Sequence, residues 1–255
     1  MTLIDTHSHL YLEEFKDDIA DVVQRAREND LQKILLPNID KDSLQSMNDL
    51  CSQYSDFFLP MIGLHPTSVK EDYKEQLELV AKECKTQKYI AIGEIGIDLY
   101  WDKTFKIQQI EALKFQIELA LEYDLPIVVH ARDSFDEIYE VLEDYRNRNL
   151  KGVMHSFTGT EAHAKKALEF GFYLGVGGIS TFKNSDVGRI IAEQPIEKLL
   201  LETDSPYLAP TPKRGKRNES SFIVHIANHL ANMKGLSTEE VGHLTTQNAK
   251  DLFKI

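Results

Sequence analysis

The sequence is poor in cysteine. Its 255 residues include only Cys51 and Cys84, which form no C-x-x-C pair and no other paired spacing. Closely spaced cysteine pairs are the usual mark of structural zinc sites and of thiol redox sites. The sequence therefore predicts two reduced thiols in a reducing compartment and argues against a fold that depends on disulfides.

Long apolar runs are also absent. No stretch approaches the roughly 18 consecutive apolar residues that a membrane-spanning helix requires. The N-terminal segment, MTLIDTHSHL, lacks the basic region and apolar run of a signal peptide. We therefore expect a cytoplasmic protein that has no membrane partner.

Positive charge is in deficit. Lys and Arg number 29 against 41 Asp and Glu, which gives a net charge of −12. This balance argues against a protein that coats nucleic acid non-specifically, because phosphate binding depends on Lys and Arg. It leaves open an enzyme that engages a few phosphates locally, since two bound divalent ions would supply positive charge where it is needed.

No linker, low-complexity tract or repeat divides the chain, so we expect a single domain over residues 1–255. Eight short β-rich runs alternate with longer amphipathic segments, which is typical of repeated strand–helix units. Several runs are continuously apolar, as parallel strands buried on both faces are. The pattern and the length, about 250 residues, favour an α/β fold of the (β/α)8 TIM barrel type over the alternative, an open doubly wound sheet. The expected strands are Leu3–Thr6, Lys33–Leu36, Phe58–Ile62, Tyr89–Glu94, Pro126–His130, Gly152–His155, Phe172–Val176 and Leu199–Glu202.

Two helical patterns close the chain, near Ser221–Met233 and Thr238–Phe253. Ser237 directly precedes the second pattern, and Glu240 follows three residues later. This spacing predicts a capping box, in which the two side chains satisfy the first free amides of the helix.

Histidines and carboxylates follow the expected strands, at the end of a barrel where active sites lie. His7 and His9 are two residues apart, so on an extended chain both point to one face and can bind one ion. Imidazole and carboxylate donors without thiolate suit Zn, Mn, Fe, Ni or Co, and also Mg with more water ligands. The candidate metal ligands are His7, His9, Glu94, His130, His155 and Asp204.

Six candidates exceed the three protein ligands that a mononuclear catalytic site usually has. We infer two divalent ions, Mg, Mn or Zn, with Glu94 as the bridge. Such a pair can bind both the attacking and the leaving oxygen of a phosphoryl group and make hydroxide available near neutral pH. Asp204 could orient or deprotonate the water, so Asp204 and Glu94 are the candidate catalytic residues. The first site would consist of His7, His9 and Asp204, and the second of His130 and His155.

Basic residues suggest where a substrate phosphate would lie. Arg132 comes two residues after His130, and its guanidinium fork suits phosphate oxygens; pairing with Asp133 or with a helix carboxylate is the alternative. The loop after the last strand carries four cations within residues 213–217 of an acidic protein. We expect Arg214 and Arg217 to contact substrate there, the alternative being an ordinary solvated face.

Three other side chains could serve the substrate. Tyr100 and Trp101 could stack on a base, as aromatic residues do in single-strand binding sites, or could only cap the barrel mouth. His65 precedes Pro66 in a loop and either contacts substrate or packs.

Taken together, these motifs resemble the TatD family of metal-dependent deoxyribonucleases, within the amidohydrolase-like barrels. The resemblance implies that His7, His9, Glu94 and Asp204 bind one metal and that Glu94, His130 and His155 bind the second. It also implies the 3′→5′ exonuclease activity on DNA that some family members have, commonly with Mg²⁺. The matching segments extend over nearly the whole chain: Asp5–Leu10, Gly63–Pro66, Gly93–Asp98, His130–Arg132, His155–Gly159 and Glu202–Pro210.

Three functions therefore compete. The first is a deoxyribonuclease that acts on single strands or 3′ ends, for which we favour a monomer, and the basic loop supports it. The second is a hydrolase of another ester or amide bond, in a small molecule or an aminoacyl-tRNA, and the net charge mildly supports it. The third is an interaction protein that keeps metal for stability, and the complete ligand set argues against it.

Overall fold

The computed structural model describes residues 1–255 and has a (β/α)8 barrel architecture. Parallel pairing gives two sheets, β1-β2-β3 and β4-β5-β6-β7-β8. Bridges between Ile62 and Ile92 and between Ser8 and Ser205 join the sheets at both seams, which closes the ring and excludes the open doubly wound alternative. The strands are β1 Leu3–Asp5, β2 Leu31–Pro37, β3 Phe58–Met61, β4 Ile92–Asp98, β5 Ile127–Arg132, β6 Gly152–Met154, β7 Tyr173–Val176 and β8 Leu199–Leu201.

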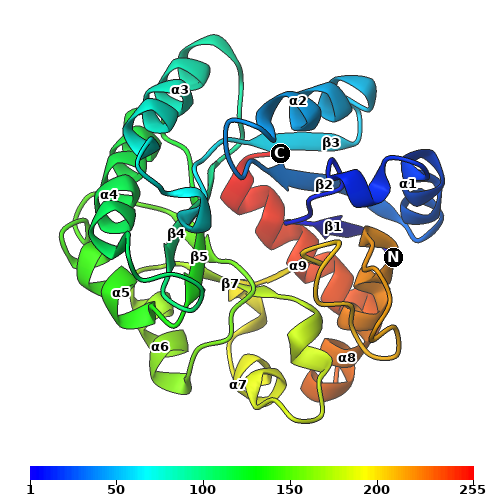
Figure 1. Cartoon of the computed structure of the whole chain (residues 1–255). Coiled ribbons are helices and arrows are strands. Elements are labelled where there is room, and N and C mark those ends of the chain that lie inside the picture. The colour runs from blue at the N-terminus through cyan, green and yellow to red at the C-terminus, as the bar shows by residue number, and fades with distance from the viewer.

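Helices surround the strands (Figure 1). One follows each strand, and α9 is an addition after the eighth strand–helix unit. None of these helices is both long enough and apolar enough to cross a membrane. The helices are α1 Ile19–Glu28, α2 Leu44–Gln53, α3 Tyr73–Thr86, α4 Lys106–Glu122, α5 Phe135–Glu143, α6 Glu161–Glu169, α7 Val187–Ala192, α8 Ile223–Lys234 and α9 Thr238–Phe253.

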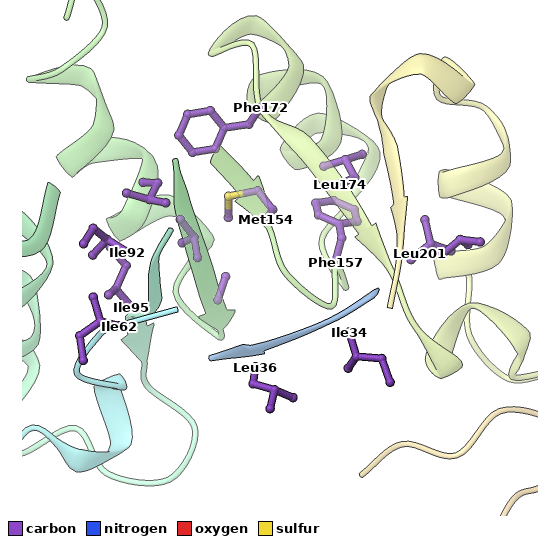
Figure 2. Close-up of a cluster of buried hydrophobic side chains, with 14 of the residues drawn as sticks. Ile34, Leu36, Ile62, Ile92, Ile95, Met154, Phe157, Phe172, Leu174 and Leu201 are labelled. Atoms are coloured by element: carbon purple, nitrogen blue, oxygen red, sulfur yellow. The ribbon is translucent and has the colours of Figure 1, made fainter. Parts of the chain in front are cut away.

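Alternation along the strands divides the core into two layers. In β2, Ile34 and Leu36 belong to the large cluster between strands and helices, whereas Leu35 belongs to a smaller cluster inside the barrel. Figure 2 shows Ile34 and Leu36 on the same side of β2. Because successive side chains point to opposite faces, a strand buried on both faces needs an unbroken apolar run. This requirement explains the Ile127–Val129 run of β5.

Helix α9 closes the N-terminal end of the barrel. Its Ala249, Leu252 and Phe253 join the interior cluster with strand residues such as Ile4 and Val128. The capping box at its start is confirmed. The Glu240 amide donates to the Ser237 hydroxyl at 3.2 Å, and the Ser237 amide donates to the Glu240 carboxylate at 2.8 Å.

Two strands, β4 and β5, continue well past their predicted ends. Glu94 and His130 were expected to end their strands, but β4 continues to Asp98 and β5 to Arg132. The strands continue because Ile95, Ile97 and Ala131 still pack into the apolar layer under the helices. The polar side chains on the inner face interrupt the apolar runs, and the prediction therefore ended both strands too early.

Replacing Phe253 with Ala should lower the free energy of unfolding by about 3–5 kcal/mol, because it leaves a cavity in a packed interior. Phe253 is 3% exposed, whereas Phe115 on α4 is 40% exposed. Phe115→Ala is therefore the matched control and should change stability far less. Urea unfolding of both variants measures the difference, and equal losses would contradict the plugging role of α9.

Candidate metal centre

The two-residue repeat of the strands builds the site on top of the interior core. Val128 in β5 and Val153 in β6 face the barrel interior. Two residues later, His130 and His155 lie on the same face and so point into the barrel mouth. Glu202 follows β8 in the same way. The apolar interior layer thus supports a polar layer at the C-terminal end of the barrel.

Backbone pairing between the ends of β1 and β8 brings Asp204 beside the His-x-His segment. The Asp204 amide donates to the His7 carbonyl at 2.9 Å, and the His9 amide donates to the Ser205 carbonyl at 2.8 Å. Asp204 itself has a φ of 56°. Residues other than glycine seldom adopt this left-handed conformation, and those that do are common at functional sites.

One oxygen of Glu94 faces the first group of predicted ligands. Glu94 Oε2 lies 3.1 Å from His7 Nε2 and 3.6 Å from His9 Nε2. The two imidazole nitrogens are 3.2 Å apart, and Asp204 Oδ1 is 3.6 Å from His9 Nε2. The structure therefore brings His7, His9, Glu94 and Asp204 together, as the sequence predicts.

The other oxygen of Glu94 faces a second group of histidines. Glu94 Oε1 lies 3.0 Å from His130 Nδ1, 3.4 Å from His65 Nε2 and 3.6 Å from His155 Nε2. The sequence predicts that His65 either contacts substrate or packs. The structure places it within this ligand cluster. His155 also lies 3.8 Å from Asp204 Oδ1, so it faces both groups.

The electrostatics of the cluster suit a bound cation. Burial opposes ionisation of Glu94, but the imidazoles of His65, His7 and His155 outweigh it and hold its pKa well below the ordinary value. Burial also opposes protonation of His155, yet Glu202 and Glu94 raise its pKa to about 10. Burial raises the pKa of Asp204 to about 6. The carboxylates thus demand positive charge, which protons on imidazole or a divalent ion can supply.

The positions of the donor atoms also suit a bound metal ion. His7, His9 and Glu94 place one donor atom each within 4.8 Å of one another, and so do His65, Glu94 and His130. His7 Nδ1 is buried without a hydrogen-bond partner, whereas His7 Nε2 faces the cluster. Imidazole and carboxylate donors converging in this way fit a divalent ion such as Zn²⁺ or Mn²⁺.

Outer partners orient the ligands, and sequence reasoning missed them. Asp98 Oδ2 lies 2.8 Å from His130 Nε2, and this contact outweighs the effect of burial and lowers the pKa of Asp98. Glu202 Oε1 lies 2.9 Å from His155 Nδ1, as a close charge contact. Asp98 and Glu202 each lie an even number of residues from a ligand on the same chain segment. That spacing was the signal that could have found them.

Gly175 on β7 makes room for the Glu202 carboxylate. A Cβ atom at residue 175 would collide with both Glu202 carboxylate oxygens. A Cβ atom at Gly177, two residues away, would meet the same side chain only at ordinary van der Waals distance, 3.8 Å. Glycine is therefore required at 175 to keep the partner of His155 in place.

A cavity of about 630 Å³ opens over the ligand cluster. Arg132 and Trp101 both line it. The Arg132 guanidinium lies 3.9 Å from the ring centroid of Tyr100 and 5.1 Å from that of Trp101. Trp101 is 69% exposed, and Tyr207, which also lines the cavity, is 49% exposed. Aromatic surface and one cation thus border the metal-ligand cluster.

The basic loop lies outside this cavity lining. Both terminal nitrogens of Arg217 pair with the Asp18 carboxylate, at 2.8 and 2.6 Å. The Arg214 guanidinium stacks over Phe182 at 3.7 Å. The structure thus does not bring Arg214 and Arg217 to the metal cluster, and their contact with substrate stays a prediction.

Replacing Gly175 with Ala should weaken metal binding about 10- to 100-fold, since it displaces the partner that orients His155. Gly177→Ala is the matched control and should bind metal as the parent protein does. Calorimetric titration of the metal-stripped proteins with Zn²⁺ or Mn²⁺ measures both affinities. An unchanged affinity in Gly175→Ala would refute the supporting role of Glu202.

Comparison with known proteins identifies relatives of this chain. The family model described as TatD related DNase matches residues 4–254. The chain is 37% identical over 254 residues to YabD of Bacillus subtilis, covering 99% of each chain. It is 34% identical over 260 residues to YcfH of Escherichia coli K12, covering 100% of this chain and 97% of the relative. Both relatives are named uncharacterized metal-dependent hydrolases.

Solved structures of other proteins are also similar to this chain. The crystal structure of YjjV, a TatD homologue from Escherichia coli K12, superposes with a TM-score of 0.92 at 29% identity, covering 99% of this chain and 98% of that one. Organophosphorus hydrolase from Deinococcus radiodurans shares only the fold, with a TM-score of 0.68 at 13% identity over 98% and 92% of the two chains. The match over almost the whole length, together with the histidine and carboxylate cluster, shows that this chain belongs to the TatD family of metal-dependent hydrolases.

Proposed function

We propose that the protein is a deoxyribonuclease that uses two divalent ions, and that it removes nucleotides from single-stranded DNA or 3′ ends. One observation carries the proposal: the two oxygens of Glu94 face different groups of imidazoles. Oε2 faces His7 and His9, and Oε1 faces His65 and His130. A carboxylate in this position suits a bridge between two ions.

The residues divide into two binding positions around this bridge. His7, His9 and Asp204 would hold one ion. His130 and His155 would hold the other, and His65 is near enough to join them. When bound, the ions supply positive charge for the phosphate oxygens and make hydroxide available near neutral pH.

Asp204 is best placed to accept the proton of the attacking water. Its side chain is 14% exposed, compared with 3% for Glu94, and it lines the cavity. A general base must reach the proton that it removes. Glu94 therefore serves as a buried ligand, while Asp204 serves as both ligand and proton acceptor.

The cavity rim supports a nucleic-acid substrate. Arg132 presents a guanidinium fork that fits phosphate oxygens, and the fork lies against the rings of Tyr100 and Trp101. The exposed Trp101 ring offers a flat face to an unpaired base. Base–aromatic stacking of this kind tolerates any sequence and contributes about 1–3 kcal/mol per base.

A second function remains in competition, namely hydrolysis of another ester or amide bond in a small molecule or an aminoacyl-tRNA. The pairing of Arg217 with Asp18 favours it, because this cation is already neutralised in the structure. The net charge of −12 favours it too, since it disfavours close approach of a long polyanion.

Metal-stripped protein should regain DNA cleavage when Mg²⁺, Mn²⁺ or Zn²⁺ is returned, because the donor cluster needs an ion to act. End-labelled single- and double-stranded DNA would shorten stepwise, and the label position gives the polarity. Glu94→Ala should be inactive. No cleavage with any ion, from protein shown to hold two, would favour the ester or amide substrate.

Trp101→Ala should lower kcat/KM on single-stranded DNA about tenfold, equivalent to ~1.4 kcal/mol of lost stacking. Its rate on a small chromogenic phosphodiester without a base should stay unchanged. Phe115→Ala, an exposed aromatic residue on α4, is the control. An equal fall on both substrates would mean that Trp101 supports the site and does not bind a base.

A further inference from the structure

His9 has an unusual outer partner. Its Nδ1 atom lies 2.9 Å from the hydroxyl oxygen of Tyr11, a side chain that is only 9% exposed. The same hydroxyl lies 2.6 Å from the carbonyl oxygen of Pro37, at the end of β2. One phenol therefore connects a candidate metal ligand to the backbone of a barrel strand.

The positions of the protons in the hydrogen bonds that link His9, Tyr11 and Pro37 can be assigned. A carbonyl oxygen only accepts, so the single hydroxyl proton of Tyr11 must go to Pro37. The hydroxyl oxygen then acts as acceptor toward His9, whose Nδ1 must carry a hydrogen. The neutral His9 ring is left with its free lone pair on Nε2, which is the atom that faces His7, Glu94 and Asp204.

We propose that Tyr11 is a positioning residue, which fixes the tautomer and ring orientation of His9 so that Nε2 binds the ion. The proposal uses the metal centre of the proposed function but does not depend on the substrate. Ligating histidines usually donate their second N–H to an oxygen that sets the tautomer.

The choice of a phenol distinguishes His9 from two other ligands. His130 and His155 have carboxylates, Asp98 and Glu202, next to their second nitrogens. A carboxylate adds negative charge that makes the imidazole more basic, whereas a neutral hydroxyl mainly orients the ring. Loss of the Tyr11 hydroxyl should therefore lower the affinity for the ion at His7 and His9, and leave the affinity for the ion at His130 unchanged.

Tyr11→Phe tests the inference, since it removes only the hydroxyl. Tyr89→Phe is the matched control because Tyr89 is also buried, and its hydroxyl bonds Glu83 far from the cluster. Titration of each metal-stripped full-length protein with Mn²⁺ or Zn²⁺ should show one binding step weakened about 10- to 100-fold in Tyr11→Phe alone.

Nitrogen NMR of the histidine rings in metal-free protein at alkaline pH is the second readout. We expect His9 to carry its proton on Nδ1 in the parent protein and in Tyr89→Phe, and both tautomers to be present in Tyr11→Phe. Unchanged tautomer and metal affinity in Tyr11→Phe would overturn the inference. Because neither readout uses DNA, a protein that fails to cleave DNA can still support it.

Discussion

The buried carboxylate of Glu94 is the constraint around which this barrel end is arranged. A charged group at this depth is costly unless opposite charge and hydrogen bonds surround it. The protein meets this need with histidines that lie in β5 or shortly after β1, β3 and β6, and that surround both oxygens of one side chain. Three of the clustered histidines, His9, His130 and His155, are in turn held by Tyr11, Asp98 and Glu202, so the polar layer is connected outward to the strands.

The two ends of the barrel have separate tasks. At the N-terminal end, α9 seals an apolar interior through Leu252 and Phe253. At the C-terminal end, the inward-facing positions two residues further along β5, β6 and β8 are polar: His130, His155 and Glu202. The apolar layer that stabilises the barrel interior and the polar layer that forms the site are therefore consecutive layers of inward-facing side chains. Glycine is required where a Cβ atom would collide with a side chain of the polar layer, as at Gly175 beside Glu202.

Much of this arrangement can be predicted from the sequence, because it depends on local periodicity. The strand and helix order, the α9 capping box and the convergence of His7 and His9 all follow from spacing. The spacing of Asp98 from Glu94 was a usable signal, but the contact of Asp98 with His130 and that of Tyr11 with Pro37 could not be predicted, because both depend on how neighbouring strands are placed in register. The pairing of Arg217 with Asp18 likewise joins residues that are 199 positions apart, and no local pattern indicates it.

The central claim is that Glu94 lies between two ions. Anomalous diffraction from crystals of the Mn²⁺-loaded protein tests it most directly. We expect two peaks about 3.5–4 Å apart, one beside His7 and His9 and the other beside His130, with Glu94 between them. A single fully occupied peak under saturating Mn²⁺ would contradict the claim.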